Sequence, residues 1–268
     1  MPLRLLLVLM LFLAGPARAE TLRIPLPDGT VLRAAFVPAA PGVPPRPAVV
    51  GLHGCAGIGT GTRPLAVPAR EREWATRLAA LGHPVVFPDS FGSRGLGPAC
   101  GRPDHPAGAS AVRSADARAT AAFMAGQPGA VPGGAVLLGW SHGGSTVLAA
   151  AAEAGGVRAA IAFYPGCGRL TFPTGVPRPA VPLLMLLGGA DDWTSPVPCR
   201  AAAATHAGQV EMVEFPGARH GFDRADPTVR SLSLPDGRTV SVAGDPAARA
   251  AAIDLVASFL ARHAGPAR

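Results

Sequence analysis

Residues 135–144 read AVLLGWSHGG, an apolar run that leads into the pattern Gly-x-Ser-x-Gly, and an alanine-rich stretch follows. A strand, a glycine-flanked turn and a helix in this order are the setting of a nucleophile elbow, which exposes a serine hydroxyl at the edge of a parallel sheet. Glycine is expected at positions 139 and 143 because so tight a turn leaves no room for a Cβ. The stretch predicts that Ser141 is a nucleophile. The alternative interpretation is a serine that caps the following helix.

Strands and helices are expected to alternate on both sides of this stretch, since short apolar runs predict strands and longer runs with helical spacing predict helices. The predicted strands are residues 22–25, 31–36, 48–52, 85–87, 135–139, 159–163, 183–187 and 210–215, and the predicted helices are residues 70–81, 112–125, 142–154, 199–207 and 246–263. Such alternation predicts an α/β fold with a mostly parallel sheet covered on both faces. With an N-terminal β-hairpin included, the sheet has the eight strands expected of an α/β-hydrolase fold.

One segment interrupts the alternation. Residues 226–245 contain two short strand-like runs around Pro235-Asp236-Gly237, which predict an inserted hairpin just after His220 and near the mouth of the site. The sequence contains no linker long enough to divide the chain, so residues 20–268 are expected to form one domain.

The first 19 residues predict a cleavable secretory signal. Arg4 supplies a basic start, residues 5–14 an apolar core, and residues 17–19 a small-x-small cleavage site, so cleavage is expected after Ala19. An apolar core of this length is too short to span a bilayer. The protein is therefore expected to be secreted or periplasmic and free of the membrane after cleavage, with an uncleaved anchor as the alternative.

The charge pattern bears on the partners of the chain. The net charge is +7 and lysine is absent, but the arginines are scattered and aromatic residues make up only 5% of the sequence. Nucleic-acid surfaces combine a basic stripe with stacking aromatics, so this class of partner is not expected. No cysteine and histidine spacing resembles a zinc site, and the sequence predicts neither a metal nor an organic cofactor.

A serine hydroxyl needs a general base, and His220 is the best candidate. It lies in the loop after the last core strand, among small residues that let a side chain reach back over the sheet. The acid that orients this base is expected in the run GGADDW at residues 188–193. Asp191 has the Gly-x-x-Asp spacing and is preferred, while Asp192 remains an alternative whose other role is a loop hydrogen bond.

The oxyanion that forms during acyl transfer needs two backbone N–H donors. One is expected from His142, which follows the nucleophile at the N-terminus of a helix, where the helix dipole also favours negative charge. The other is expected from the loop after the third strand, at Cys55.

The four cysteines of an exported chain suggest two disulfides, for which three pairings exist. The first two follow the third and fourth strands, and the last two follow the sixth and seventh strands. These strand pairs are neighbours in the expected sheet, about 4.8 Å apart. The predicted bonds are therefore Cys55–Cys100 and Cys167–Cys199, which would brace the loops around the site.

Several of these loops together resemble the dienelactone hydrolase family, in its exported branch. The resemblance covers the candidate catalytic loops of nearly the whole chain after the signal, and it implies an α/β-hydrolase fold that hydrolyses esters or lactones without a cofactor. The matching stretches are LHGCAG at 52–57, PDSFGSRG at 88–95, GWSHGG at 139–144, FYPGC at 163–167, GADDWT at 189–194 and PGARHGF at 216–222.

The chain departs from the family pattern at two positions. The best-known members have a cysteine nucleophile where this chain has Ser141, and a glutamate beside the oxyanion loop where it has Gly54, so the site resembles that of a conventional esterase. Family members bind an anionic substrate through two arginines; Arg224 matches one, and Arg94 matches the other with an offset of one residue. The candidate substrate-binding residues are Arg94, Tyr164, Trp193 and Arg224, the alternative for the arginines being a solvated surface role.

These observations predict a serine hydrolase that cleaves a small carboxylic ester or lactone through an acyl-enzyme. Ser141 attacks, His220 transfers the proton, and Asp191 orients the imidazole. The alternatives are a catalytically silent binding protein on the same fold, or a peptidase or thioesterase of the same superfamily. The sequence names neither the acyl nor the alcohol group of the substrate, nor the oligomeric state.

Overall fold

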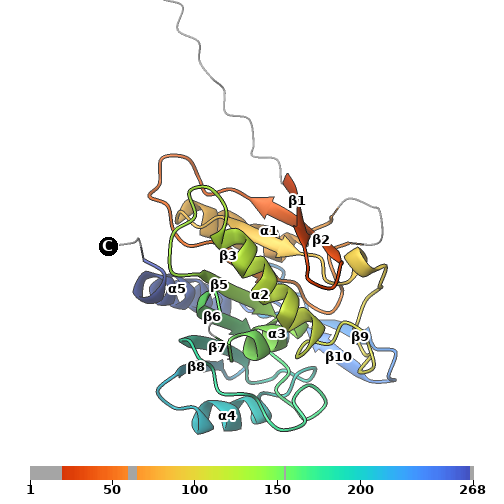
Figure 1. Cartoon of the computed structure of the whole chain (residues 1–268). Helices are drawn as coiled ribbons and strands as arrows, with labels where there is room; N and C mark the ends of the chain where they lie inside the picture. The colour runs from red at the N-terminus through yellow and green to blue at the C-terminus, as the bar shows by residue number, and fades with distance from the viewer. Residues whose placement is uncertain (1–19, 60–64, 154, 266–268) are drawn as a thin grey trace, which may run out of the picture.

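Eight strands form one mixed sheet in the computed structural model, which describes residues 20–59, 65–153 and 155–265 (Figure 1). The predicted signal peptide, residues 1–19, lies outside the described residues. The strand order is β1-β2-β4-β3-β5-β6-β7-β8. The strands are β1 (Glu20–Pro25), β2 (Val31–Val37), β3 (Val49–Leu52), β4 (Val85–Pro88), β5 (Ala135–Trp140), β6 (Val157–Phe163), β7 (Leu183–Gly188) and β8 (Val210–Phe215).

The predicted α/β-hydrolase architecture is confirmed. β1 pairs antiparallel with β2, and β2 with β4, whereas β4, β3, β5, β6, β7 and β8 all run parallel to one another. The hairpin closes at Asp28, whose carboxylate accepts a hydrogen bond from the Thr30 amide at 2.9 Å. Every residue of β3, β5 and β7 is buried, as expected for parallel strands covered on both faces.

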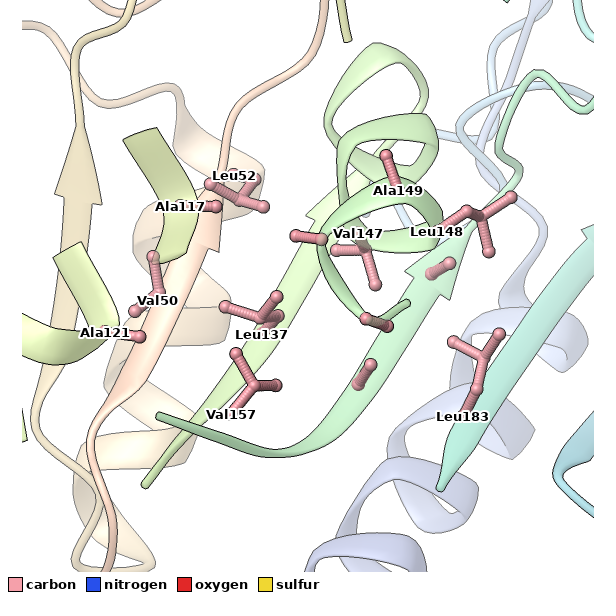
Figure 2. Close-up of a cluster of buried hydrophobic side chains, with 14 of the residues drawn as sticks. Val50, Leu52, Ala117, Ala121, Leu137, Val147, Leu148, Ala149, Val157 and Leu183 are labelled. Carbon is pink, nitrogen blue, oxygen red and sulfur yellow. The ribbon is translucent and has the colours of Figure 1, made fainter. Parts of the chain in front are cut away.

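Helices cover both faces of this sheet and divide the buried apolar side chains into two large clusters. One cluster includes side chains of α2, α3 and α4, and Figure 2 shows part of it between α2, α3 and the strands. The other cluster includes side chains of α1 and α5. The helices are α1 (Ala69–Ala80), α2 (Val112–Ala125), α3 (His142–Ala150), α4 (Pro196–Thr205) and α5 (Pro246–His263), with a short 3₁₀ turn η1 (Gly92–Arg94).

The largest differences from the predicted boundaries lie at the ends of two helices. α3 ends at Ala150 rather than at residue 154, ahead of a turn in which Gly156 has a φ of 77°. α4 begins at Pro196 rather than at residue 199, because the Ser195 hydroxyl caps it by accepting from the Val197 amide and proline suits the first helical turn. None of the described helices is both long and apolar enough to cross a membrane.

The segment inserted after His220 forms a separate two-stranded hairpin, drawn in light blue in Figure 1. Its strands are β9 (Arg230–Ser233) and β10 (Thr239–Val242), paired antiparallel around the Pro235-Asp236-Gly237 turn that the sequence suggested. An isolated bridge pairs Val242 with His220, and the Ala243 amide donates to the His220 carbonyl at 3.2 Å. The hairpin is therefore attached to the loop that carries the candidate base.

Both predicted disulfides are present. Cys55–Cys100 joins the loops that follow β3 and β4, and Cys167–Cys199 joins the loop after β6 to α4. The Cα atoms of the two pairs are 4.9 and 5.1 Å apart. Two disulfides fit a protein that works in an oxidising compartment.

Loss of the Cys167–Cys199 bond is expected to lower the free energy of unfolding by roughly 3–4 kcal/mol. This is the chain-entropy value for a loop closed by two cysteines that are 32 residues apart. The measurement is urea unfolding of the Cys167→Ala/Cys199→Ala variant beside the wild type under non-reducing conditions. A variant with an unchanged unfolding midpoint would contradict the expectation.

Candidate active site

Ser141 occupies a strained turn between β5 and α3. Its φ is 55° and its ψ is −118°, a backbone conformation that residues other than glycine rarely adopt. The turn is fixed on both sides, because the Ser141 amide donates to the Phe163 carbonyl at 2.9 Å and the Ser145 amide donates to the Ser141 carbonyl at 2.9 Å. This is the geometry that a nucleophile elbow requires.

The two flanking glycines are required by close backbone packing. A Cβ at Gly139 would meet the Gly143 carbonyl, and a Cβ at Gly143 would meet the Leu52 carbonyl at the end of β3. The sequence-based expectation that no side chain fits at these positions is confirmed. The same packing brings the loop after β3 against the turn, so that a Cβ at Gly54 would lie 4.0 Å from the Ser141 Cβ.

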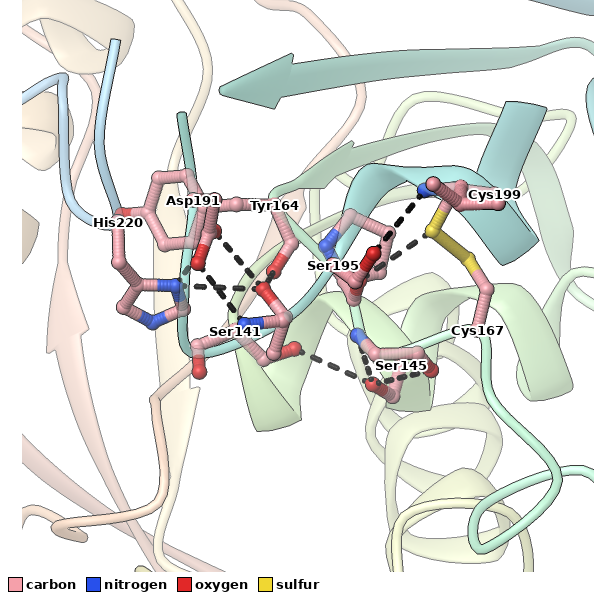
Figure 3. Close-up of a disulfide and its surroundings, with 12 residues drawn as sticks. Ser141, Ser145, Tyr164, Cys167, Asp191, Ser195, Cys199 and His220 are labelled. Atoms are coloured by element: carbon pink, nitrogen blue, oxygen red, sulfur yellow. Dashed lines mark hydrogen bonds and ion pairs between the residues drawn. A yellow bond between two sulfur atoms is a disulfide. The ribbon is translucent and has the colours of Figure 1, made fainter. Parts of the chain in front are cut away.

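His220 is held by Asp191. The Nδ1 atom of the imidazole lies 2.8 Å from Asp191 Oδ2, and Figure 3 shows this contact beside Ser141. The other carboxylate oxygen accepts the backbone amides of Trp193 and Thr194 at 2.9 and 2.8 Å. A carboxylate oxygen accepts only, so Nδ1 carries the proton and Nε2 of the neutral ring is left as an acceptor. Asp191 therefore fixes the orientation of the His220 imidazole.

Asp192, the alternative acid, points elsewhere. Its two oxygens accept the Ser241 amide at 2.9 Å and the Ser241 hydroxyl at 2.6 Å. Ser241 lies in β10, so Asp192 anchors the inserted hairpin. Partial burial acts to raise the pKa of Asp192, but the hydrogen bonds from Ser241 outweigh it and lower that pKa below its ordinary value.

Ser141 lies where two clefts meet. One cleft has a volume of about 510 Å³ and is lined by both Ser141 and His220, and the other, of about 340 Å³, is lined by Ser141 and His142. The Cys55–Cys100 disulfide and Trp193 line both clefts. A substrate bound across Ser141 would have one side in each cleft.

The loop after β3 contains a backbone amide without a protein acceptor among the described residues. Its consecutive carbonyls are all engaged: that of His53 accepts from Arg113 at 2.8 Å, that of Gly54 from the His53 ring at 2.8 Å, and that of Cys55 from the Ala99 amide at 2.8 Å. In a trans peptide the N–H points away from the C=O, so the Cys55 amide faces away from the partners of the Gly54 carbonyl. Among the described residues, neither the Cys55 nor the His142 amide donates to a protein group, which leaves both for a ligand.

Two aromatic rings enclose His220. The ring of Trp193 lies 4.7 Å from the imidazole and the ring of Tyr164 lies 4.6 Å from it, measured between centroids. The Tyr164 hydroxyl donates to Asp223 at 2.6 Å and accepts from Arg70 at 2.6 Å. Burial raises the pKa of Tyr164 well above its ordinary value, so this hydroxyl stays protonated. Asp223 also accepts the indole N–H groups of Trp74 and Trp140, both at 2.8 Å.

The four candidate substrate-binding residues divide into two pairs. Trp193 and Arg224 line the larger cleft. Arg94 does not line either cleft: its guanidinium donates twice to Asp116 at 2.8 Å, which corrects the match made with an offset of one residue. Tyr164 is 1% exposed and its hydroxyl belongs to the buried network behind His220, so its contact is with the imidazole rather than with a ligand in the clefts.

Sequence reasoning missed three charged residues around the site. Asp223 and Arg70 both hydrogen-bond to the hydroxyl of Tyr164, whose ring contacts His220, and Arg113 contacts both the His53 carbonyl and the His142 ring. Asp223 lies three residues after His220, and nothing in its local sequence indicates burial. The residues that the structure describes contain no cluster of three or more histidine, cysteine, aspartate or glutamate side chains suited to a metal ion.

Comparison with known proteins gives a family and a fold. A family model described as the dienelactone hydrolase family matches residues 34–264. No curated protein matches the chain in sequence.

Three solved structures illustrate the fold. P91, a dienelactone hydrolase-like promiscuous phosphotriesterase from metagenomic libraries, has a TM-score of 0.68 and 19% identity over 92% of this chain and 99% of that chain. XC6422 from Xanthomonas campestris, a member of the α/β serine hydrolases without a lid, has a TM-score of 0.54 and 26% identity over 77% and 87% of the two chains. A thermophilic esterase from Thermogutta terrifontis with bound butyrate has a TM-score of 0.62 and 21% identity over 92% and 94%.

Because Asp192 anchors the hairpin, we predict that the attachment of the hairpin at Ser241 depends on pH. Because the pKa of Asp192 is lowered in the folded protein, its contribution is present above the ordinary value of 3.8 and is lost as the pH falls through the lowered pKa. Asp192→Ala should remove the protection of the Ser241 amide from hydrogen exchange at neutral pH, and the wild type should lose that protection only in acid. Asp254→Ala, at an exposed position on α5, is the control. Equal protection in all three proteins at pH 7 would contradict this role.

Proposed function

The chain belongs to the dienelactone hydrolase family, and we propose that it is a serine hydrolase that cleaves a small carboxylic ester or lactone through an acyl-enzyme. The observation that carries the proposal is the pair formed by His220 and Asp191 at 2.8 Å, in which His220 lines the same cleft as Ser141. Ser141 itself has the φ of 55° that a nucleophile elbow needs.

In the proposed mechanism, His220 Nε2 takes the proton of the Ser141 hydroxyl as its oxygen attacks the ester carbonyl carbon. The Cys55 and His142 amides donate to the oxyanion of the tetrahedral intermediate, and the first residues of α3 add their helix dipole. His220 then returns the proton to the leaving alkoxide, which departs as the alcohol. Water repeats the sequence on the acyl-enzyme and releases the carboxylic acid with Ser141 restored. For a lactone, alcohol and acid are parts of one product.

The larger cleft suits a substrate that carries a negative charge away from the ester. Among the charged side chains that line it, Arg70 pairs with Glu71, Glu73 with Arg77 and Arg249, and Asp226 with Arg230. Arg224 lines the same cleft, and no ion pair of the described residues involves it. Its guanidinium is thus available to a carboxylate, which it can bind through two hydrogen bonds.

We place this reaction outside the cytoplasm. The predicted signal at residues 1–19 and the two disulfides of the folded protein support export to an oxidising compartment. The protein is proposed to act there as a single α/β-hydrolase domain over residues 20–268, on a small-molecule substrate and with no cofactor.

A fluorophosphonate probe tests the nucleophile and the acid. The wild type should be labelled and should hydrolyse short-chain aryl esters, and Ser141→Ala should do neither. Asp191→Asn should lower kcat by roughly 10,000-fold because the imidazole loses its orienting carboxylate, whereas Asp192→Asn should retain most of the activity. Absence of labelling in the wild type, or labelling that persists in Ser141→Ala, would overturn the proposed function.

A matched pair of esters tests the role of Arg224. For an ester with a remote carboxylate, Arg224→Ala should lower kcat/KM by about 10- to 100-fold, the value of a hydrogen bond to a charged group. The uncharged ester of the same size should be hydrolysed almost as before. The control is Arg200→Ala, which removes an arginine of α4 that pairs with Glu214. Equal losses for both esters would exclude carboxylate binding by Arg224.

A further inference from the structure

Arg113 links the two segments that carry the free amides. It is the second residue of α2 and is 0% exposed. One guanidinium nitrogen donates to the His53 carbonyl at 2.8 Å, in the loop that leads to Cys55. Another lies 2.6 Å from Nδ1 of His142, the residue after Ser141. A single buried side chain therefore connects the loop after β3 to the start of α3.

The charge of Arg113 has no ion-pair partner among the described residues. The carboxylates that act on its charge are those of Asp116 and Asp89, which pair with Arg94 and Arg33 respectively. Burial lowers the pKa of Arg113 to about 9, which still leaves it charged at neutral pH. Its other close contact is with the face of the Phe91 ring, at 5.0 Å.

The buried position of the Arg113 charge lowers the free energy of unfolding of the protein. An unpaired charge is expensive to bury, and a cation in the first turn of a helix also opposes the helix dipole. An arrangement that costs free energy at rest and lies beside a reaction centre is typical of a functional site. The arginine is therefore suited to a negative charge that forms only during the reaction.

His142 connects Arg113 to the start of α3 through a ring that carries no charge of its own. Burial, together with the charge of Arg113, lowers the pKa of His142 to about 3, so its ring is neutral throughout the working range. Because Nδ1 accepts the arginine N–H, the ring proton lies on Nε2. The ring has one tautomer and one orientation, and its backbone amide is fixed with it.

We propose that Arg113 is a positioning residue that aligns the Cys55 and His142 amides as one oxyanion hole and supplies the uncompensated positive charge behind them. This inference rests on the proposed serine hydrolase function. A neutral ester gains little from that charge, but the tetrahedral intermediate carries a full negative charge on its oxygen. The interaction therefore strengthens as the transition state forms, and it acts on kcat rather than on substrate binding.

Arg113→Met tests the inference with an uncharged side chain of similar length. We expect kcat for a neutral aryl ester to fall about 30-fold, less than the roughly 100- to 1,000-fold loss of a direct donor, with KM within about twofold of the wild type. A boronic acid forms an anionic tetrahedral adduct on the serine, so its inhibition constant should rise by the same factor as kcat falls. Arg113→Lys, which keeps the charge but cannot make both contacts, should be intermediate.

Arg118→Met is the matched control, because Arg118 lies on the same helix and pairs with Glu153. It should keep the kcat and the boronic acid affinity of the wild type. If Arg113→Met does not fold, His142→Ala removes one of the two side-chain contacts and keeps the amide, and it should show the same parallel change in kcat and boronic acid affinity. A folded Arg113→Met with unchanged kcat, or with a loss confined to KM, would overturn the inference. Inactive wild type, or activity that survives Ser141→Ala, would instead refute the proposed function.

Discussion

The close approach of the turn at Ser141 to the end of β3 is the constraint on which the site depends. The Gly143 backbone packs against the Leu52 and His53 carbonyls so closely that no Cβ fits between them. That contact holds Ser141 in its strained conformation, and it brings the loop of Cys55 beside the N-terminus of α3. A side chain at Gly143 would push the end of β3 and the loop that follows it away from the turn at Ser141. Strain in the turn is thus supported by the packing of a buried parallel sheet.

Around this contact, most buried polar groups have partners supplied by other loops. Asp191 is satisfied by two amides, the Thr194 hydroxyl and His220, and Asp223 by two indoles and a phenol. Groups held in this way do not need to reorganise when charge develops nearby. Arg113 differs from them, since its buried Nε has no hydrogen-bond partner and its charge has no ion-pair partner among the described residues. The site therefore combines carboxylates held by several hydrogen bonds with one buried cation, Arg113, that forms no ion pair among the described residues.

Much of this arrangement follows from local sequence patterns and one rule of topology. The carboxyl ends of parallel strands meet at one edge of the sheet, so the loops with Cys55, Ser141, Asp191 and His220 could be expected to converge, and the cysteine pairs could be assigned from neighbouring strands. The sequence alone does not decide which of the adjacent residues Asp191 and Asp192 contacts His220, because only the hairpin contact at Ser241 shows where Asp192 points. Arg113 was not predictable. On a helix such a residue usually faces solvent, and its partners lie 29 and 60 residues away.

The inserted hairpin is connected to His220 both through its backbone and through the loop of Asp191 and Asp192. Two adjacent carboxylates diverge from one loop: Asp191 holds His220, while Asp192 holds Ser241 in β10. The hairpin in turn bridges back to the His220 backbone through Val242 and Ala243. Loop, base and hairpin therefore form a closed ring of contacts, in which a change at the hairpin alters the backbone that carries the imidazole. Since Leu232 and Val242 also line the larger cleft, the hairpin both shapes the proposed substrate cleft and supports His220, the proposed base. An insertion that had only widened the cleft would need no contact with His220, whereas this one makes two.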